Sequence, residues 1–476
     1  MSTKTAKAAT TEANVVCPSP LEGSTLPRDW EWVSLGNICR TTSGGTPSRK
    51  NKEYFEGDIP WVKSGELPDG PVAEIEEYIT GEAVKNSSAK QFPKGTLLIA
   101  LYGATVGKLG VLTKEAATNQ AVCAIFPPDY LETKYLFWYL RFVRPDLIAQ
   151  AIGGAQPNIS QGILRNLLIP VAPLYQQKRI VAEIEKQFSC LDEAVANLKR
   201  VKANLKRYKA AVLKSAVEGK LTEDWRKQHS GVEPASKLLE RILAERHTKW
   251  GGKGKYKEPE APDVTGLPLL PNGWTWARLE QLGVILGGLT KNPKRAKLAR
   301  KLPYLRVANV YANQLRLDEI ERIGVQDSEL DKLLLRKGDL LVVEGNGSKG
   351  QIGRLAIWDG SIDPCVHQNH LIKVRLVVGL MNKWILFWLL SSVGRHFIEE
   401  VSSSTSGLYT LSVNKVGDLP VIVPSLAEQE QIVAEVERRL SVIEELEAAV
   451  EANLTRADRL RQAVLRQAFD GKLISP

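Results

Sequence analysis

The sequence has few cysteines and no long apolar run, which argues against two broad classes of protein. Its five cysteines are widely spaced and form no Cys-x-x-Cys pair, a pattern typical of reduced thiols in a cytoplasmic protein. The most apolar runs, residues 136–140 and 384–390, are far too short to span a bilayer. Residues 1–25 lack the apolar core of a signal peptide, so we expect a disordered N-terminal tail there.

Motifs of known catalytic and cofactor sites are also missing. The sequence contains no P-loop, zinc-protease motif, nucleophile elbow or Asn/Asp-Pro-Pro-aromatic motif of an adenine methyltransferase. Residues 345–350 match G-x-G-x-x-G, but a strand-like run follows where a dinucleotide site needs a helix. Cys365, His367 and His370 are close in sequence but lack a fourth zinc ligand at finger-like spacing. We therefore predict a non-catalytic binding protein with no cofactor and no metal.

One stretch of the chain occurs twice. Residues 174–221 align without a gap with residues 426–473, and 18 of the 48 positions are identical, which indicates a duplication. In both copies apolar residues recur every three or four positions between charged flanks, which predicts a long helix packed on another helix. Gly219 and Gly471 stand where a left-handed residue ends a helix. A helix lying on a globular core is the alternative, but it would need a wider apolar face.

Each copy follows a globular segment, and the two segments have a similar outline. Residues 26–173 and 267–425 both start with a Trp-x-Trp motif and continue with short β-type runs. Each then has one helix-like stretch, at 131–151 and 381–401, a Gly/Ser-rich loop, and an extended apolar run. The runs FPKGTLLIA and LRKGDLLVV correspond, whereas most other residues differ. The outline predicts one common frame that holds two different recognition surfaces.

The remaining segments connect these parts. Residues 222–266 are expected to form a connector with a short basic helix at 235–250 and a flexible linker, and residues 426–476 contain the second long helix. If the two helices pack antiparallel, each globular segment lies at the start of its own helix and beside the end of the other. A direct repeat in sequence then becomes a pseudo-twofold arrangement, which suits duplex DNA because its backbone is dyad-related.

The charge balance permits a polyanionic partner. Lys and Arg number 64 against 54 Asp and Glu, for a net charge of +10. Residues 291–306 hold seven Lys or Arg and no acid, and residues 46–63 are the more dilute counterpart in the first segment. Clusters of this kind contact DNA phosphates, although a solvated loop is the alternative. The candidate DNA contacts are Arg49, Lys50, Lys52, Lys63 and Lys108 in the first segment, and Lys291, Lys294, Arg295, Lys297, Arg300, Lys301, Arg306, Lys349 and Arg354 in the second.

Several motifs together resemble the specificity subunit of type I restriction–modification enzymes. They are AEQEQIVAEVE at 427–437, its variant YQQKRIVAEIE at 175–185, the AVLxxAxxGKL endings at 211–221 and 463–473, GKLTEDW at 219–225, and GGTPSR…GDIPWVKSGEL at 44–67. The resemblance covers residues 26–476. Gln176 departs from the usual Glu-Gln pair of the family, which puts the local contact of that position in doubt.

The resemblance implies an α+β fold in which two mixed α/β target recognition domains are separated by a pair of long antiparallel coiled-coil helices. Each domain would read one half of a bipartite, asymmetric DNA target. The chain would also dock two methyltransferase subunits, which carry S-adenosylmethionine, and ATP-driven motor-nuclease subunits. The candidate methyltransferase contacts at the helix starts are Gln177, Arg179, Glu183, Glu428, Gln429 and Glu435.

Two other functions remain open from the residues alone. The first is a coiled-coil scaffold without DNA specificity, which would show no salt-dependent binding of DNA in the presence of a methyltransferase. The second is a stand-alone DNA-processing enzyme, which would methylate or cut DNA without partners.

Overall fold

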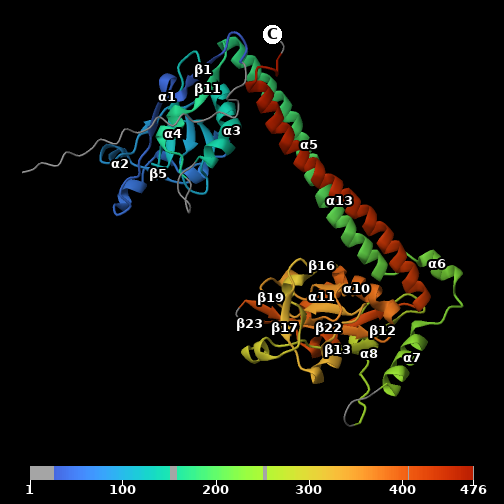
Figure 1. Ribbon diagram of the computed structural model, residues 1–476. Coiled ribbons are helices and arrows are strands. Elements are labelled where there is room, and N and C mark those ends of the chain that lie inside the picture. The colour runs from blue at the N-terminus through green and yellow to red at the C-terminus, as the bar shows by residue number, and fades with distance from the viewer. Residues whose placement is uncertain (1–25, 151–157, 250–254, 406, 475–476) are drawn as a thin grey trace, which may run out of the picture. The chain divides into compact units, whose positions relative to one another are not determined.

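The computed structural model describes residues 26–150, 158–249, 255–405 and 407–474. The predicted tail at 1–25 and most of the predicted Gly-rich loop at 152–160 lie outside the described residues. The chain divides into unit 1, Met1–Lys199 with Glu451–Pro476, and unit 2, Arg200–Val450 (Figure 1). Each unit combines a mixed α/β domain with parts of two long helices, which confirms the predicted fold class. Among the described residues, no helix is both long and apolar enough to cross a membrane.

Unit 1 contains two sheets and one small strand pair. The larger sheet has the order β2 (Arg40–Ser43), β10 (Val122–Phe126), β7 (Leu97–Ala100), β8 (Leu109–Leu112) and β4 (Gly70–Val72). The smaller sheet has the order β5 (Tyr78–Ile79), β3 (Ile59–Val62), β9 (Ala116–Thr118) and β6 (Gln91–Phe92). The strand pair consists of β1 (Glu31–Ser34) and β11 (Leu168–Val171), with Trp32 opposite Pro170. Short helices α1 (Leu35–Ile38), α2 (Gly81–Lys85) and α4 (Gln161–Asn166) connect these strands.

The central strand of the larger sheet is buried on both faces. Leu97 and Ile99 of β7 belong to the cluster that includes α3 (Thr133–Ala149), whereas Leu98 and Ala100 belong to a cluster on the opposite face. Side chains of a strand point alternately to its two faces, so an uninterrupted apolar run requires a cover on each side. Helix α3 covers one face.

The two main sheets of unit 2 keep the strand order of their counterparts in unit 1, but each has one edge strand fewer. Its larger sheet has the order β13 (Gly283–Leu286), β22 (Leu371–Leu376), β18 (Leu340–Val343) and β20 (Leu355–Ile357). Its smaller sheet has the order β17 (Glu321–Gly324), β14 (Lys301–Leu305) and β21 (Val366–His367), and its strand pair is β12 (Thr275–Arg278) with β25 (Pro420–Val423). The matched runs FPKGTLLIA and LRKGDLLVV lead into β7 and β18, which occupy equivalent places. The similar outline expected from the sequence is therefore present.

One predicted helix is divided in two. The stretch 381–401 forms α10 (Asn382–Leu390) and α11 (Ser392–Val401), because Ser391 between them has an extended backbone. The Ser391 hydroxyl accepts a hydrogen bond from the Gly394 N–H and so caps α11. Gly394 lies so close to the Trp388 carbonyl that a Cβ there would meet its oxygen at 2.1 Å. The other predicted helices correspond to α3 and, in the connector, to α7 (Ala235–Thr248), which α6 (Glu223–Gln228) precedes.

The duplicated segments form two helices of 44 residues, α5 (Leu174–Val217) and α13 (Leu426–Phe469). Gly219 and Gly471 follow their ends with φ of 70° and 72°, as predicted for left-handed C-terminal residues. In unit 1 the start of α5 packs against the end of α13, where Phe188 and Phe469 share one apolar cluster. In unit 2 the start of α13 meets the residues that follow α5. Within each unit, therefore, the beginning of one helix meets the end of the other, which agrees with antiparallel packing.

Candidate nucleic-acid interface

The basic segment of unit 2, residues 291–306, is a structured loop that leads into β14. Asn292 starts the 3₁₀ helix η3 (Pro293–Lys297), and its side chain accepts a hydrogen bond from the Arg295 N–H at 3.2 Å. The Arg295 guanidinium donates to both carboxylate oxygens of Glu329, at 2.9 and 2.8 Å, and to the Gly324 carbonyl at 3.2 Å. The hydrogen bonds from Arg295 hold the pKa of the Glu329 carboxyl below its usual value. The Arg295 side chain is only 15% exposed, so these hydrogen bonds are largely shielded from water and anchor the loop.

Three other cations of this segment also have acidic partners from outside it. Glu321 on β17 pairs with Lys291 at 2.9 Å and with Arg306 at 2.7 Å. Asp327 pairs with Arg300 at 2.6 Å. The exposed cations of the segment that form no ion pair within the described part of the chain are Lys294, Lys297 and Lys301. The segment is thus less positive than its sequence suggests.

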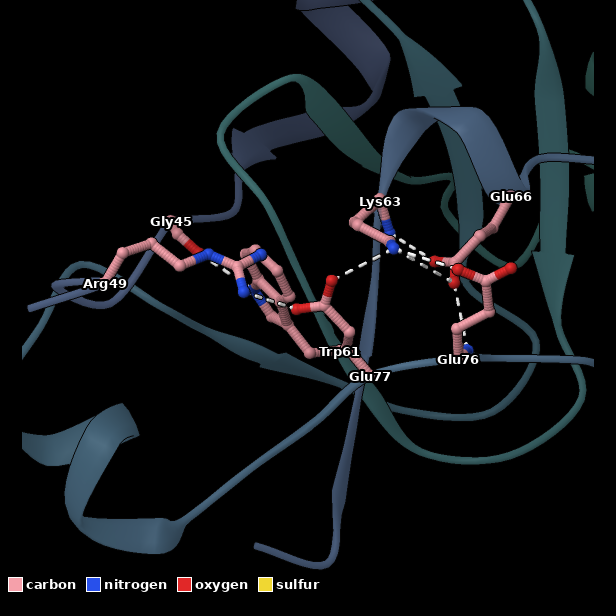
Figure 2. Close-up of polar contacts among 7 residues, drawn as sticks. All are labelled: Gly45, Arg49, Trp61, Lys63, Glu66, Glu76 and Glu77. Atoms are coloured by element: carbon pink, nitrogen blue, oxygen red, sulfur yellow. Dashed lines mark hydrogen bonds and ion pairs between the residues drawn. The ribbon is translucent and has the colours of Figure 1, made fainter. Parts of the chain in front are cut away.

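Two of the four cations in the counterpart segment of unit 1 are also neutralised (Figure 2). The Arg49 guanidinium lies 4.2 Å from the Phe55 ring centroid and 5.2 Å from that of Trp61, and it pairs with Glu77 at 2.8 Å. Lys63 lies 3.0 Å from Glu77 and 3.1 Å from Glu76, and these hydrogen bonds raise the pKa of Lys63. Arg49 and Lys63 are therefore held among carboxylates.

The other candidates of unit 1 differ in exposure. Lys50 and Lys52, the latter at the start of η1 (Lys52–Phe55), are exposed and form no ion pair among the described residues. Lys108 is half-buried, and its backbone N–H donates to the Thr105 carbonyl. Of these three, Lys50 and Lys52 have the access that a phosphate contact needs.

Residues 345–350 form a turn between strands. They comprise β19 (Gly345–Asn346) and the first residues of η6 (Lys349–Gln351), after which the chain enters β20. No long helix follows, which agrees with the strand-like run expected from the sequence. Lys349 is exposed, and Arg354 donates to the Val307 carbonyl at 3.0 Å.

Tyr311 and Arg316 form a second cationic cluster with Arg354, and neither was among the predicted residues. The guanidinium carbons of Arg316 and Arg354 lie 4.1 and 4.7 Å from the centroid of the Tyr311 ring. Tyr311 ends β15 (Val310–Tyr311), and Arg316 follows β16 (Gln314–Leu315) in a tight hairpin with Asn313 at φ 54°. Asn313 adopts the left-handed conformation that this turn needs, which asparagine tolerates better than most residues.

Three of the candidate partner contacts at the helix starts are buried within the chain. Gln177 donates to the Ala172 carbonyl at 2.7 Å, and Gln429 donates to the equivalent Pro424 carbonyl at 2.9 Å. Glu428 is 2% exposed and is fully engaged by unit 2 residues. Burial leaves these three side chains no surface to offer a partner, so we replace the predicted contact with a role in joining each helix to its domain. Arg179, Glu183 and Glu435 are exposed or half-exposed, and their contact with a methyltransferase stays a prediction.

The two helix starts explain the glutamine that departs from the family pattern. Trp30 donates its indole N–H to Gln176 at 2.7 Å, and Trp274 donates to Glu428, the equivalent residue, at 2.8 Å. Glu428 additionally accepts from Arg226 and Thr222. The residue at the start of α13 is therefore a carboxylate, Glu428, which binds a guanidinium as well as an indole N–H. The equivalent residue of α5 is a neutral amide, Gln176, which accepts from an indole N–H.

The cysteine and histidines considered as metal ligands have separate environments. Cys365 is buried, His367 is bonded through Nδ1 to the Leu333 carbonyl at 3.2 Å, and His370 is bonded to Glu344 at 3.0 Å. Within the residues that the structure describes, no group of three His, Cys, Asp or Glu is arranged to hold a metal ion.

The chain is similar in sequence and in structure to known proteins. Residues 27–206 match the family model of the type I restriction modification DNA specificity domain. The match comprises the α/β domain of unit 1 and the first part of α5.

Two relatives span nearly the whole chain. The chain is 24% identical to the type I restriction enzyme EcoKI specificity subunit of Escherichia coli (strain K12), over 94% of this chain and 90% of that protein. It is 23% identical to the StySPI specificity subunit of Salmonella potsdam, with the same two coverages. A solved chain from a study of complex assembly and conformational transition of the type I R-M system has a TM-score of 0.64 at 20% identity, covering 94% of this chain and 100% of that one. That likeness supports the fold.

Proposed function

We propose that this chain is the non-catalytic DNA sequence-recognition subunit of a type I restriction–modification complex. Each α/β domain would read one half of a bipartite, asymmetric target. The observation that carries the proposal is that the two domains share the order of the corresponding strands in their main sheets while their cation-bearing surfaces differ. A common frame with different surfaces suits the reading of two different half-sites.

The partners follow from the same assignment. The chain assembles with other subunits of its system, and we propose two methyltransferase subunits and motor-nuclease subunits, in the cytoplasm of a prokaryotic cell where the DNA lies. Arg179, Glu183 and Glu435, which lie near the starts of α5 and α13, are the proposed methyltransferase contacts. The side-chain hydrogen bonds of Arg438 and Arg439 lower the pKa of Glu435 to about 2, so it stays charged at neutral pH.

All the candidate DNA contacts except Lys108, Lys349 and Arg354 divide into two kinds. Lys294, Lys297 and Lys301, together with Lys50 and Lys52 of unit 1, are exposed and without ion pairs among the described residues, so we propose that they contact phosphates. The acid-paired cations would hold the loops in shape and contact DNA only by exchanging a carboxylate for a phosphate. They are Arg49, Lys63, Lys291, Arg295, Arg300 and Arg306.

The proposal is tested with the full chain in complex with the methyltransferase of its own system. A target duplex is first selected from a random library, and binding is then measured across a KCl series. Replacing Lys294, Lys297 and Lys301 by Ala should lower the salt slope by about three, roughly one per phosphate contact. The matched control replaces three exposed connector lysines that form no ion pair among the described residues, Lys237, Lys255 and Lys257, and should leave the slope unchanged. Failure of the wild-type complex to select any sequence would contradict the recognition function.

A further inference from the structure

The cluster of Tyr311, Arg316 and Arg354 brings two positive charges onto one aromatic ring. Both guanidinium carbons lie within 5 Å of the ring centroid, so the charges are closer together than the ~10 Å over which 0.1 M salt screens them. A ring face attracts a cation, which offsets part of the repulsion between the two arginines. Stacking also restricts the guanidinium planes and thereby reduces the entropy lost when a ligand binds.

In the described part of the chain, no carboxylate compensates this cluster. Within the described residues, neither Arg316 nor Arg354 has an acidic group within ion-pair distance, in contrast to Arg49, Arg295, Arg300 and Arg306. The Nε–H of Arg354 is moreover buried without a hydrogen-bond partner. Two adjacent guanidiniums without a counter-ion cost free energy, and an anion placed between them removes that cost. The cluster is therefore built for an anionic ligand.

We infer that Tyr311, Arg316 and Arg354 form a binding site for a backbone phosphate of duplex DNA, an inference that rests on the proposed function. Guanidinium groups bind phosphate oxygens through two parallel N–H donors, which a lysine cannot do. The Val307 carbonyl, which accepts from Arg354, fixes one of the two guanidiniums. Arg316 is exposed and makes no side-chain hydrogen bond in the described structure, so it is the movable half of the site. Free inorganic phosphate presents the same chemistry and is distinguished by the experiment.

The experiment uses the full chain with its methyltransferase subunits and the duplex selected by the wild-type complex. Binding to this duplex and to an unrelated duplex is measured across a KCl series for Arg316→Ala, Arg354→Ala and the double variant. Because both arginines bind one phosphate, the double variant should lower the salt slope by about one in total, and each single variant by part of that amount. Each substitution should also weaken binding to both duplexes by the same factor, because a phosphate contact carries no sequence information. Tyr311→Phe keeps the ring and should bind as the wild type does, whereas Tyr311→Leu should bind more weakly.

Arg40→Ala is the matched control. Arg40 is exposed and lies 4.3 Å from the ring centroid of Phe126 in unit 1, so it is another ring-stacked arginine without an ion pair among the described residues. It stands alone on its ring, and its substitution should leave the slope unchanged. An equal fall in slope for Arg40→Ala would mean that any exposed arginine contributes, and it would overturn the assignment of a specific site.

Other outcomes separate this inference from the proposed function. If the wild-type complex selects a target but the double variant keeps the full salt slope, the phosphate site is refuted and the recognition function stands. A change of preference at one base would replace the phosphate by a base contact and also refute the site. Inorganic phosphate is titrated in parallel, and its binding to the wild type without any effect of the variants on DNA would identify a small-anion site instead. If Arg354→Ala does not fold, Arg316→Ala alone decides the matter.

Discussion

Glu428 offers the sharpest test of how each long helix is attached to its domain. Its carboxylate accepts hydrogen bonds from Thr222 at 2.7 Å and Arg226 at 2.9 Å through Oε1, and from Trp274 at 2.8 Å through Oε2. The Glu428 side chain is 3% exposed and that of Arg226 is 19% exposed. A glutamine at this position has only one side-chain oxygen to accept from these donors. Its NH₂ group, which can only donate, would then face the remaining donor. Glu428→Gln therefore breaks a charge-assisted bond and leaves at least one buried donor unpaired.

The magnitude follows from these contacts. A hydrogen bond to a charged group contributes about 1.5–3 kcal/mol, and loss of one partner of a buried ion pair costs about 3–5 kcal/mol. Arg226 retains some access to water, so we expect a loss of about 3 kcal/mol from the free energy of unfolding of unit 2. For a unit of this size about 1 kcal/mol shifts the melting temperature by roughly 2–4 °C, which gives a fall of roughly 6–12 °C.

The assay is thermal unfolding of the full chain, followed by calorimetry and by tryptophan fluorescence. Glu445→Gln is the control, because Glu445 is an exposed residue of the same helix and its substitution should change stability by less than about 0.5 kcal/mol. Gln176→Glu in unit 1 should not stabilise, since Gln176 accepts the Trp30 indole N–H and no guanidinium. If Glu428→Gln melts within the error of Glu445→Gln, the proposed attachment is wrong.

Four further outcomes are expected. Burial lowers the pKa of His367 from 6.5 to about 4, so below pH 6.5 the unfolded chain binds a proton that the folded chain does not. Unit 2 should lose about 2 kcal/mol between pH 7 and pH 5, and urea unfolding of His367→Gln should not show this loss. Replacing residues 26–173 by the corresponding domain of a related subunit should change one half of the methylated motif in a methylome; a change in both halves would contradict independent reading. Four residues added after Asn197 with the apolar seam preserved lengthen α5 by about 6 Å, and the preferred spacer should grow by one or two base pairs at about 3.4 Å each, while an active variant with an unchanged spacer would show that the helices do not set it. The purified chain alone should transfer no methyl group from S-adenosylmethionine, and turnover that survives removal of partner subunits would refute its non-catalytic role.

The sequence predicted the parts of the fold that depend on local periodicity. The two long helices and their glycine ends follow from a pattern that the chain contains twice, and the matched strands β7 and β18 follow from one shared motif. The break at Ser391 was not predicted, because it depends on the contact of Gly394 with the Trp388 carbonyl. Such contacts form only when the chain is folded.

The candidate site was less predictable for the same reason. The segment 291–306 was correctly recognised as a cluster of cations, but Glu321 and Glu329, which pair with its members, lie outside it in sequence. The burial of Glu428 could likewise not be predicted from the sequence, because its charge suggested a surface residue. A sequence shows which charges a segment carries, whereas the fold decides which of them are already paired.

Pairing of the recognition-loop cations within the protein also affects how the chain would search for its target. A cation that already has a carboxylate partner, such as Arg300 with Asp327, displaces fewer counter-ions when it approaches a DNA strand, so it adds little to binding at random positions. Weak attachment at random positions means short stays there, and a genome offers about a million or more such positions. A recognition subunit whose cations are largely paired with carboxylates would dissociate quickly from non-target sequences and would remain only where base contacts hold it.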